Sequence, residues 1–461
     1  MTFLLFYLPA VLAVYYLAPN KLKNLVLFVF SLLFYAWGEP VYVGLMIFST
    51  VLDYTCGLTA ERFRGTRKAK IALLVSVVVN LSLLGVFKYA DFLIATVNSV
   101  FGCALPLLGL PLPIGISFYT FQTMCYTIDV YRGDTKAQRN IVSFGAYVSL
   151  FPQLIAGPIV RYQTIAEQMD CRTHSSDQFS LGVRRFVCGL AKKVLLANNI
   201  GLLWNTISQT DAANLTVLSA WLGLIAFSFQ IYFDFSGYSD MAIGLGSMFG
   251  FTFCENFNYP YISASVTEFW RRWHISMGTW FRDYVYIPLG GNRCGLAVQL
   301  RNIAVVWLLT GFWHGASWNY VLWGVYFGAL LIAEKFFLLE KLKKAPLVGH
   351  VYTVFCIFIS WVLFSFEDMA KGAAYFKAMF GFGAGLCNST ALYELASYLP
   401  LLGICAVAAT PLAARLYRKL NEKCASAVMT LADASGIACG MLLSTAYLIS
   451  GSYNPFLYFR F

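Results

Sequence analysis

The stretch WRRWHISMGTWFRDYVYIPLGGNR, residues 270–293, decides what kind of fold this chain adopts. Its charged residues recur too often for a helix that crosses hydrocarbon, namely Arg271, Arg272, Arg282 and Asp283. At about 100° per residue on a helical wheel, the large apolar side chains fill one arc, and these charged residues lie outside it. The pattern predicts one helix that lies in the plane of a membrane, with its aromatic face buried and its arginines toward headgroups or protein carbonyls.

Two of the chain's four histidines lie in or just after this stretch. His274 falls beside the aromatic arc, where its imidazole can point into the protein interior. His314 lies at the end of a mostly apolar segment and is flanked by Gly311 and Gly315. The small-xxx-small spacing of these glycines indicates a close approach of helices. An ionisable residue at membrane depth is a functional candidate by default. A buried histidine is also often a hydrogen-bonded structural group, so the residues alone leave both interpretations open.

The composition is that of a polytopic membrane protein. Of the 461 residues, 59% are hydrophobic and only 12% are charged, against about 25% charged in soluble domains. The net charge of +11 needs no nucleic-acid partner, because basic loops beside anionic lipid are its ordinary cause. The 12 cysteines are scattered singly and suggest neither a disulfide framework nor a metal site. The first apolar run has no basic residues before it, so we expect no cleavable signal peptide.

The distribution of basic residues predicts the topology. Apolar runs near 3–18, 23–37, 41–60 and 71–87 each suit a spanning helix. The first and third connecting loops are basic and the second has no basic residue, which places the N-terminus outside the cell by the positive-inside rule. Further spans are predicted at about 317–333, 350–366, 396–414 and 434–450, with a short amphipathic helix at 370–380.

Two segments rich in proline and glycine interrupt this series, LPLLGLPLPIG (105–115) and FPQLIAGPIVRY (151–162). Irregular backbone at membrane depth is tolerated only when it is buried in protein or lines a cavity, so we expect both to line an internal path. The helix predicted after the first segment carries Tyr119 and Gln122, as a cavity wall would. His174 lies in a polar loop, where we expect it to be solvated.

A basic helix at 182–201 contains Lys192 and Lys193. It is either a boundary helix whose cations reach toward the membrane surface or a basic mouth for an anionic cosubstrate such as the phosphates of coenzyme A. Asp234 and Asp240 lie in an apolar setting and need donors, which this helix is best placed to supply. We expect both aspartates to be scaffold rather than catalytic.

The order of motifs along the chain resembles that of the membrane-bound O-acyltransferase (MBOAT) family. Within it, the chain looks most like the bacterial branch that contains the membrane subunit of the alginate O-acetylation machinery. The motifs run through nearly the whole chain: PIGISFYTFQ (113–122), FPQLIAGPIVRY (151–162), GLAKKVLLAN (189–198), YFDFSGYSDMAIGLG (232–246), ENFNYPYIS (255–263), TEFWRRWHIS (267–276), TWFRDYVYIPLGGNR (279–293), LLTGFWHGASWNYVLWG (308–324) and YNPFLYFRF (453–461). The pair WRRWHIS and GFWHG is the most specific of these.

The resemblance implies an all-α membrane fold, a rim of helices around a thin central region with in-plane and re-entrant helices. It implies one domain over 1–461, with N-terminal helices at 1–112, a motif-bearing core at 113–324 and C-terminal helices at 325–461. The family's catalytic histidine maps onto His314 and its second histidine onto His274. Residues expected to line the substrate tunnel are Tyr119, Gln122, Asp234, Asp240, Arg271, Arg272, Trp313 and Asn319, with Lys192 and Lys193 as donor-binding candidates.

The sequence therefore predicts a membrane O-acetyltransferase that carries acetyl from cytoplasmic acetyl-CoA to an external hydroxyl. Imidazole suits this chemistry because it takes up a proton near neutral pH. The acceptor is an extracytoplasmic polysaccharide or a secreted SGNH-type partner, and acetyl-CoA is a cosubstrate, with no permanently bound cofactor or metal. A transporter and a non-catalytic scaffold of a glycan export complex remain alternatives, as do D-alanyl or peptidoglycan acyl transfer within the family. We expect a multi-pass protein of the bacterial inner or cytoplasmic membrane.

Overall fold

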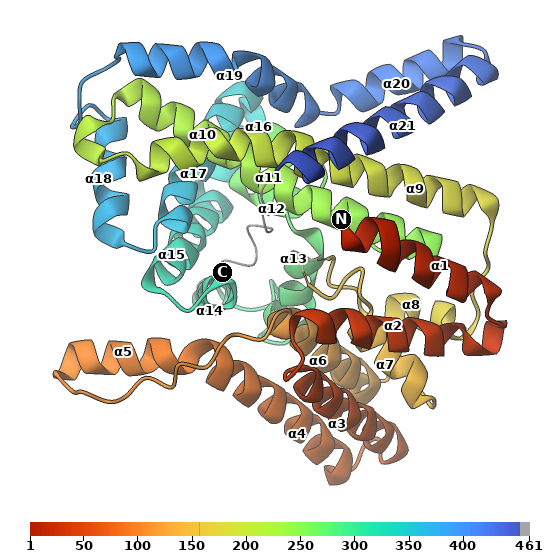
Figure 1. Ribbon diagram of the computed structural model, residues 1–461. Helices are drawn as coiled ribbons and strands as arrows, with labels where there is room; N and C mark the ends of the chain where they lie inside the picture. Colours follow the sequence, from red (N-terminus) through yellow and green to blue (C-terminus); the bar gives the residue numbers. More distant parts are fainter. Residues whose placement is uncertain (156, 452–461) are drawn as a thin grey trace. The chain divides into compact units, whose positions relative to one another are not determined.

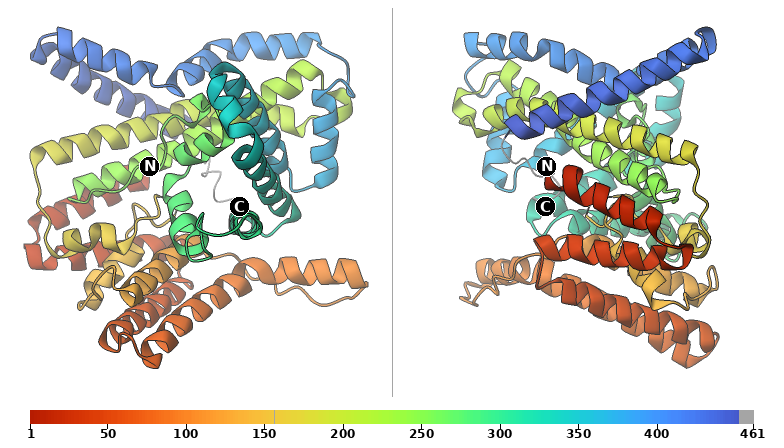
Figure 2. Two further views of the ribbon diagram at one scale, coloured as in Figure 1. Left: turned by 180° about the vertical axis from the view of Figure 1, so that it is seen from behind. Right: turned by 45° about the vertical axis from the view of Figure 1, so that its right-hand side comes forward.

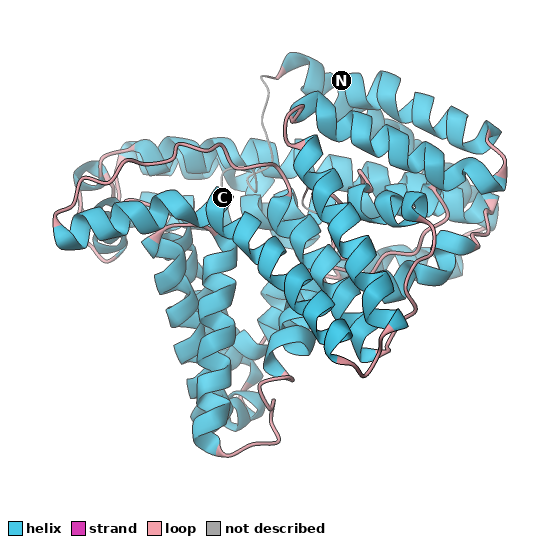
Figure 3. Ribbon diagram, turned by 90° about the horizontal axis from the view of Figure 1, so that it is seen from below, coloured by secondary structure: helices cyan, strands magenta, loops and turns pink. Residues whose placement is uncertain are grey.

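The computed structural model describes residues 1–155 and 157–451. Within these ranges the regular structure is entirely helical, without a strand (Figure 3). Ten helices of the described chain are long and apolar enough to cross a membrane. The predicted class, an all-α multi-pass membrane protein, is confirmed. The terminal motif at 453–461 lies outside the described residues.

The chain divides into two compact units. The first comprises Met1–Phe186 and Met241–Cys254, and the second comprises Val187–Asp240 and Glu255–Phe461. Two helices, α9 (Ser176–Ala191) and α11 (Val217–Met248), continue from one unit into the other. The single domain expected from the sequence stays a prediction.

The first unit is a bundle in which α3 packs against α4, α6 and α7, and α2 packs against α7 (Figure 1). Its helices are α1 (Leu8–Leu17), α2 (Lys23–Gly38), α3 (Val43–Arg62), α4 (Arg67–Leu84), α5 (Ala90–Phe101), α6 (Ile116–Arg132), α7 (Ile141–Ser149) and α8 (Tyr162–Asp170). The first four correspond to the first four predicted spans. A glycine permits the close packing of α3 on α6, because a Cβ at Gly57 would meet the Tyr126 ring at 2.6 Å.

The two proline-rich segments differ from each other. Residues 151–154 and 157–160 are buried and irregular, as predicted. Residues 105–112 are exposed, so this part of the 105–115 segment is not buried in protein, and its place along an internal path stays a prediction. They run back along α5 (Figure 1), where the Asp91 carboxylate accepts from the amides of Leu108 (2.7 Å) and Gly109 (3.0 Å). These hydrogen bonds give two backbone amides of the irregular segment a side-chain acceptor.

The second unit contains the remaining helices. They are α10 (Asn198–Gln209), α12 (Val266–Arg272), α13 (Ile275–Phe281), α14 (Leu296–His314), α15 (Trp318–Ala333), α16 (Leu339–Lys344), α17 (Pro346–Ser365), α18 (Met369–Met379), α19 (Ser389–Ala408), α20 (Leu412–Lys423) and α21 (Ser426–Ser450). Helix α18 confirms the short helix predicted at 370–380. Helices α20 and α21 form a hairpin (Figure 2), so the basic residues after 414 belong to a helix.

Helices α14 and α15 of the second unit pack closely and lie side by side in Figure 1. Gly311 of α14 faces the backbone of Tyr320 and Gly324, and a Cβ built on it would lie 3.2 Å from the Gly324 Cα. Gly315 follows the end of α14 and lies against the Tyr320 ring. The close approach predicted from the glycine spacing is confirmed, and it places the end of α14 inside the packed helices.

Candidate active site

The segment that carries His274 is broken at that residue. Instead of one in-plane helix, α12 ends at Arg272 and α13 begins at Ile275, and His274 adopts a left-handed conformation with φ of 46°. The preceding segment restores the lost hydrogen bonds: the Ile275 amide donates to the Asn256 carbonyl (3.0 Å) and the Asn258 amide to the Arg272 carbonyl (2.9 Å). The prediction of a continuous helix is wrong. A helical wheel considers one segment alone, so it cannot show that the backbone of residues 256–258 stabilises a break.

One hydroxyl and one carboxylate accept hydrogen bonds from the first backbone amides of α12. The Ser265 hydroxyl accepts from the Glu268 amide at 3.0 Å, so Ser265 is the N-cap of α12. The fully buried Glu334 carboxylate accepts from the amides of Val266 (2.6 Å) and Thr267 (2.7 Å), and from the Thr267 hydroxyl (2.6 Å). A carboxylate at the positive end of a helix is electrostatically favourable. Glu334 was not among the predicted residues, although a lone carboxylate at the end of an apolar span is a signal of an important contact.

His274 is fully buried and held in one orientation by Asn256. Its Nδ1 lies 3.1 Å from the Asn256 Oδ1, which also accepts from the Ser276 hydroxyl at 2.9 Å. The Asn256 amide nitrogen donates to the Ser239 hydroxyl at 3.0 Å, which identifies the Asn256 oxygen as the atom facing the imidazole. Nδ1 therefore carries the hydrogen, and Nε2 presents its lone pair. Asn256 was quoted within a motif, but its role was not predicted.

Burial keeps this imidazole neutral. It lowers the pKa of His274 to about 3, because the charged form would lose its hydration without gaining a carboxylate partner. Within the described chain, Nε2 has no hydrogen-bond partner. His274 is therefore an acceptor at Nε2 and a donor only toward Asn256, which excludes it as a hydrogen-bond donor to a negatively charged oxygen in this tautomer.

His314 is the last residue of α14 and is buried among aromatic rings. Its ring centroid lies 4.9 Å from that of Trp323, 5.4 Å from Phe364 and 5.1 Å from Trp313. The Trp313 ring also lies 5.7 Å from the His274 ring. The second unit thus brings the two motif histidines against the same tryptophan, and Trp313 forms part of the wall around both.

The other predicted residues of this unit have structural contacts. The Asn319 amide donates to the carbonyls of Leu363 and Phe364, both at 3.3 Å, and so joins α15 to the end of α17. Arg272 pairs with Glu268 at 2.8 Å and donates to the Asn258 carbonyl at 3.1 Å. Arg271 is exposed. Asn319 lies beside an aromatic neighbour of His314, whereas the two arginines lie on the outer side of α12.

The basic helix supplies the donors expected for the two aspartates. Lys192 pairs with Asp240 at 2.6 Å, and Lys193 pairs with Asp234. The boundary-helix interpretation is wrong for Lys193, because its side chain is buried with its carboxylate rather than extended to a membrane surface. Gly237 makes room for this arrangement, since a Cβ there would meet the Gly189 carbonyl of α9 at 2.8 Å.

Three further predicted residues belong to the first unit. Tyr119 and Gln122 are buried on α6, and their side-chain polar atoms have no hydrogen-bond partner within the described chain. His174 is not merely solvated, so that prediction is wrong. Its Nε2 lies 2.9 Å from the Tyr15 hydroxyl, and its ring packs on Tyr15 and Tyr16. The loop residue contacts a helix far away in sequence, which local polarity could not reveal.

Comparison with known proteins connects this geometry to a family. The model of the membrane-bound O-acyltransferase family matches residues 134–366, which include both buried histidines and most of their aromatic neighbours. The chain belongs to this family. It is therefore a membrane O-acyltransferase.

Relatives of this acyltransferase match it over most of its length. It is 40% identical to a probable alginate O-acetylase of Azotobacter vinelandii, with 100% of this chain and 99% of that protein covered. It is 46% identical to a probable alginate O-acetylase of Pseudomonas aeruginosa, over 83% of this chain and 74% of that protein. A peptidoglycan O-acetyltransferase of Helicobacter pylori is 32% identical over 84% of this chain and 80% of its own length.

Proposed function

We propose that this O-acyltransferase takes acetyl from cytoplasmic acetyl-CoA and transfers it to a hydroxyl outside the cell. The acceptor is an extracytoplasmic polysaccharide or a secreted SGNH-type transferase that relays the group. The acetyl group and the polysaccharide are supported by the names of two relatives, both probable alginate O-acetylases. The basic first and third loops support a cytoplasmic-membrane protein with its N-terminus outside.

The observation that carries this proposal is the pair of buried histidines in contact with Trp313. In the proposed reaction His314 takes the proton from the acceptor hydroxyl as its oxygen attacks the thioester carbonyl carbon. The new C–O bond forms, the C–S bond breaks, and the leaving thiolate receives the proton from His314. Cations are favoured at helix C-termini, so the last position of α14 suits an imidazole that becomes positively charged during transfer.

His274 has a different proposed role. It is neutral, and its Nε2 can only accept a hydrogen bond, so it orients a donor such as the incoming hydroxyl. Its rotation is restricted by Asn256 and by the Phe235 ring, whose centroid lies 4.7 Å away. Such restraint holds the reacting groups in a productive geometry without a large entropic cost at the moment of reaction.

Of the two adjacent lysines of the basic helix, the more exposed one is the candidate for recognising acetyl-CoA. The Lys192 side chain is 31% exposed while it pairs with Asp240, whereas Lys193 is enclosed with Asp234. We therefore propose Lys192 as the residue of this pair that can meet a phosphate of acetyl-CoA. Lys193 with Asp234 then stabilises the packing of the π-helical segment Lys192–Ala197, which continues α9, on α11.

The test compares substitutions of His314 in the purified full-length protein. His314→Ala removes general-base catalysis, which is worth roughly 10²–10⁴-fold in turnover. His314→Gln should be nearly as inactive, because an amide retains a hydrogen bond but cannot take up the proton. His350→Gln is the matched control, since this partly exposed histidine of α17 bonds to the Ser263 carbonyl (3.2 Å) and to no other group of the described chain.

Two measurements are made on each variant: acetyl transfer from acetyl-CoA, and coenzyme A binding by calorimetry. We expect binding to survive in both His314 variants while turnover falls. Robust turnover by His314→Ala would refute the base assignment, and loss of binding would move His314 to donor recognition. A wild-type protein that neither transfers acetyl nor hydrolyses the thioester would favour a transporter or a scaffold.

A further inference from the structure

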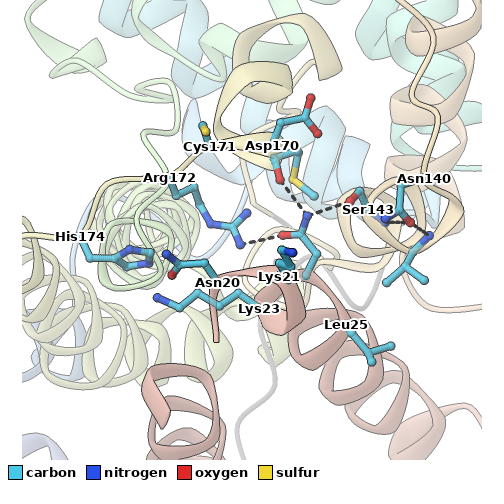
Figure 4. A pocket seen from close by; sticks show the side chains of 13 residues that line it. Asn20, Lys21, Lys23, Leu25, Asn140, Ser143, Asp170, Cys171, Arg172 and His174 are labelled. Carbon is cyan, nitrogen blue, oxygen red and sulfur yellow. Dashed lines mark hydrogen bonds between the residues drawn. The ribbon is translucent and has the colours of Figure 1, made fainter. Parts of the chain in front are cut away.

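The first unit contains a pocket of about 480 Å³ that is separate in its residues from the two histidines of the second unit. It lies where the loop between α1 and α2, the start of α7 and the segment after α8 meet (Figure 4). The volume is within the range of roughly 300–1,000 Å³ typical of small-molecule sites. The residues that carry the argument are Lys21, Lys23, Asn24, Asn140, Arg172 and His174.

Lys23 is the most unusual group in this pocket. Its side chain is only 8% exposed, and within the described chain its ammonium has no carboxylate at ion-pair distance. It faces the rings of Tyr15 and Tyr16, with its nitrogen 5.1 and 5.6 Å from their centroids. These cation–π contacts compensate only part of the lost hydration, so a buried ammonium of this kind favours an anionic partner.

Arg172 is held in place beside it. Its guanidinium donates to the Asn24 side-chain oxygen at 2.7 Å, the Tyr15 hydroxyl at 3.1 Å and the Gln168 carbonyl at 3.1 Å. It also lies over the Phe251 ring, 4.4 Å from the centroid. Within the described chain these hydrogen-bond partners are all neutral, so they orient the guanidinium without compensating its charge. A fixed guanidinium suits the recognition of phosphate.

The remaining charges do not neutralise the pocket. Lys21 is exposed at its edge, and Asp170, the one acidic lining residue, accepts from the Gln138 amide at 3.2 Å. His174 contributes a nearby imidazole whose pKa is lowered, first by burial and then by Lys23 and Arg172. The start of α2 at Lys23 and the start of α7, capped by the Asn140 side chain, add two positive helix ends.

We propose that this pocket binds a phosphate group. The ligand is either the headgroup of an anionic phospholipid or a soluble phosphate ester. A headgroup is consistent with the position of the pocket at the start of α2, a candidate span, on the loop that the positive-inside rule assigns to the cytoplasm. Basic pockets at such a boundary are suited to phospholipid headgroups. This site is independent of the acyl-transfer chemistry proposed above.

The test uses full-length protein in a nonionic detergent after removal of bound lipid. Phosphatidylglycerol, phosphatidylcholine and glycerol 3-phosphate are added separately, and binding is followed by native mass spectrometry and by the midpoint of thermal unfolding. The variants are Lys23→Gln and Arg172→Gln. Lys70→Gln is the control, because Lys70 is an exposed cation in the first turn of α4.

We expect phosphatidylglycerol to bind and to raise the midpoint of the wild type, whereas phosphatidylcholine does neither. Each pocket variant should bind at least tenfold more weakly, and Lys70→Gln should bind like the wild type. Binding of glycerol 3-phosphate with the same dependence on Lys23 and Arg172 would identify a soluble ester as the ligand.

Lys23→Gln supplies a second signature that does not depend on the fate of Arg172→Gln. Without lipid it should unfold at a higher temperature than the wild type, because it removes an uncompensated buried charge. With phosphatidylglycerol that advantage should disappear. The proposal is overturned if neither phosphatidylglycerol nor glycerol 3-phosphate binds. It is also overturned if the pocket variants bind these compounds as tightly as Lys70→Gln does.

Discussion

Replacing His274 by Asn should remove an acid-sensitive contribution to the stability of this membrane protein. The imidazole is fully buried, and its pKa falls from 6.5 to about 3 on folding because burial disfavours the charged form. The unfolded chain therefore takes up a proton as the pH falls below 6.5, and the folded chain does so only near pH 3. The free energy of unfolding is therefore not reduced by this titration above pH 6.5. It decreases progressively as the pH falls from 6.5 to about 3.

The magnitude follows from the pKa values. The interval of about 1.5 pH units between 6.5 and 5, at about 1.36 kcal/mol per unit, corresponds to about 2 kcal/mol. This is roughly a 30-fold change in the ratio of folded to unfolded protein. Asn does not titrate, tolerates the left-handed conformation at this position and can still bond to Asn256.

The assay is the free energy of unfolding at pH 7 and pH 5, measured by titration with a denaturing detergent. Compared with the wild type, His274→Asn should show a loss on acidification that is smaller by about 2 kcal/mol. His350→Asn, which changes a partly exposed histidine, should keep the wild-type dependence. If His274→Asn and the wild type lose the same stability between these pH values, the neutral state assigned to His274 is wrong.

Three other outcomes test the topology and the packing. A cysteine at position Thr66 in a cysteine-depleted background should be labelled only from the cytoplasm and one at Glu39 only from outside; labelling of both from one side contradicts the orientation. Glu334→Gln should lower the free energy of unfolding by about 2 kcal/mol or more, because charge-assisted hydrogen bonds are worth about 1.5–3 kcal/mol each. Glu340→Gln, which changes an exposed carboxylate, should not lower it. Gly311→Ala should destabilise by about 1–3 kcal/mol through overpacking, and an unchanged thermal midpoint would show that α14 and α15 can separate without cost.

The sequence predicted those features that depend on local composition and spacing. Helical class, most spans and the close approach at Gly311 follow from apolar length and small-residue spacing, and the structure confirms them. The assignment of His314 as the base depends on the family resemblance rather than on residue pattern alone, and it stays a prediction.

The features that the sequence did not predict depend on partners distant along the chain. The break at His274 exists because residues 256–258 complete its backbone hydrogen bonds. The environment of His174 is set by Tyr15, a residue 159 positions away. From the sequence alone, Lys193 is expected to be a surface cation, whereas in the structure it is buried in an ion pair with Asp234. Periodicity measures how one element alternates along its own axis, and it contains no information on which distant group satisfies a buried donor.

The contact between Glu334 and the start of α12 has a consequence for the order in which the protein is built. The carboxylate lies 68 residues downstream of the Val266 amide that it accepts from. At synthesis rates of roughly 5–20 residues per second, the ribosome needs roughly 3–14 s to add that length of chain. During that interval the first amides of α12 lack their acceptor. The histidine-bearing segment can therefore reach its final form only after α15 has been made, so the candidate site is completed late in biosynthesis.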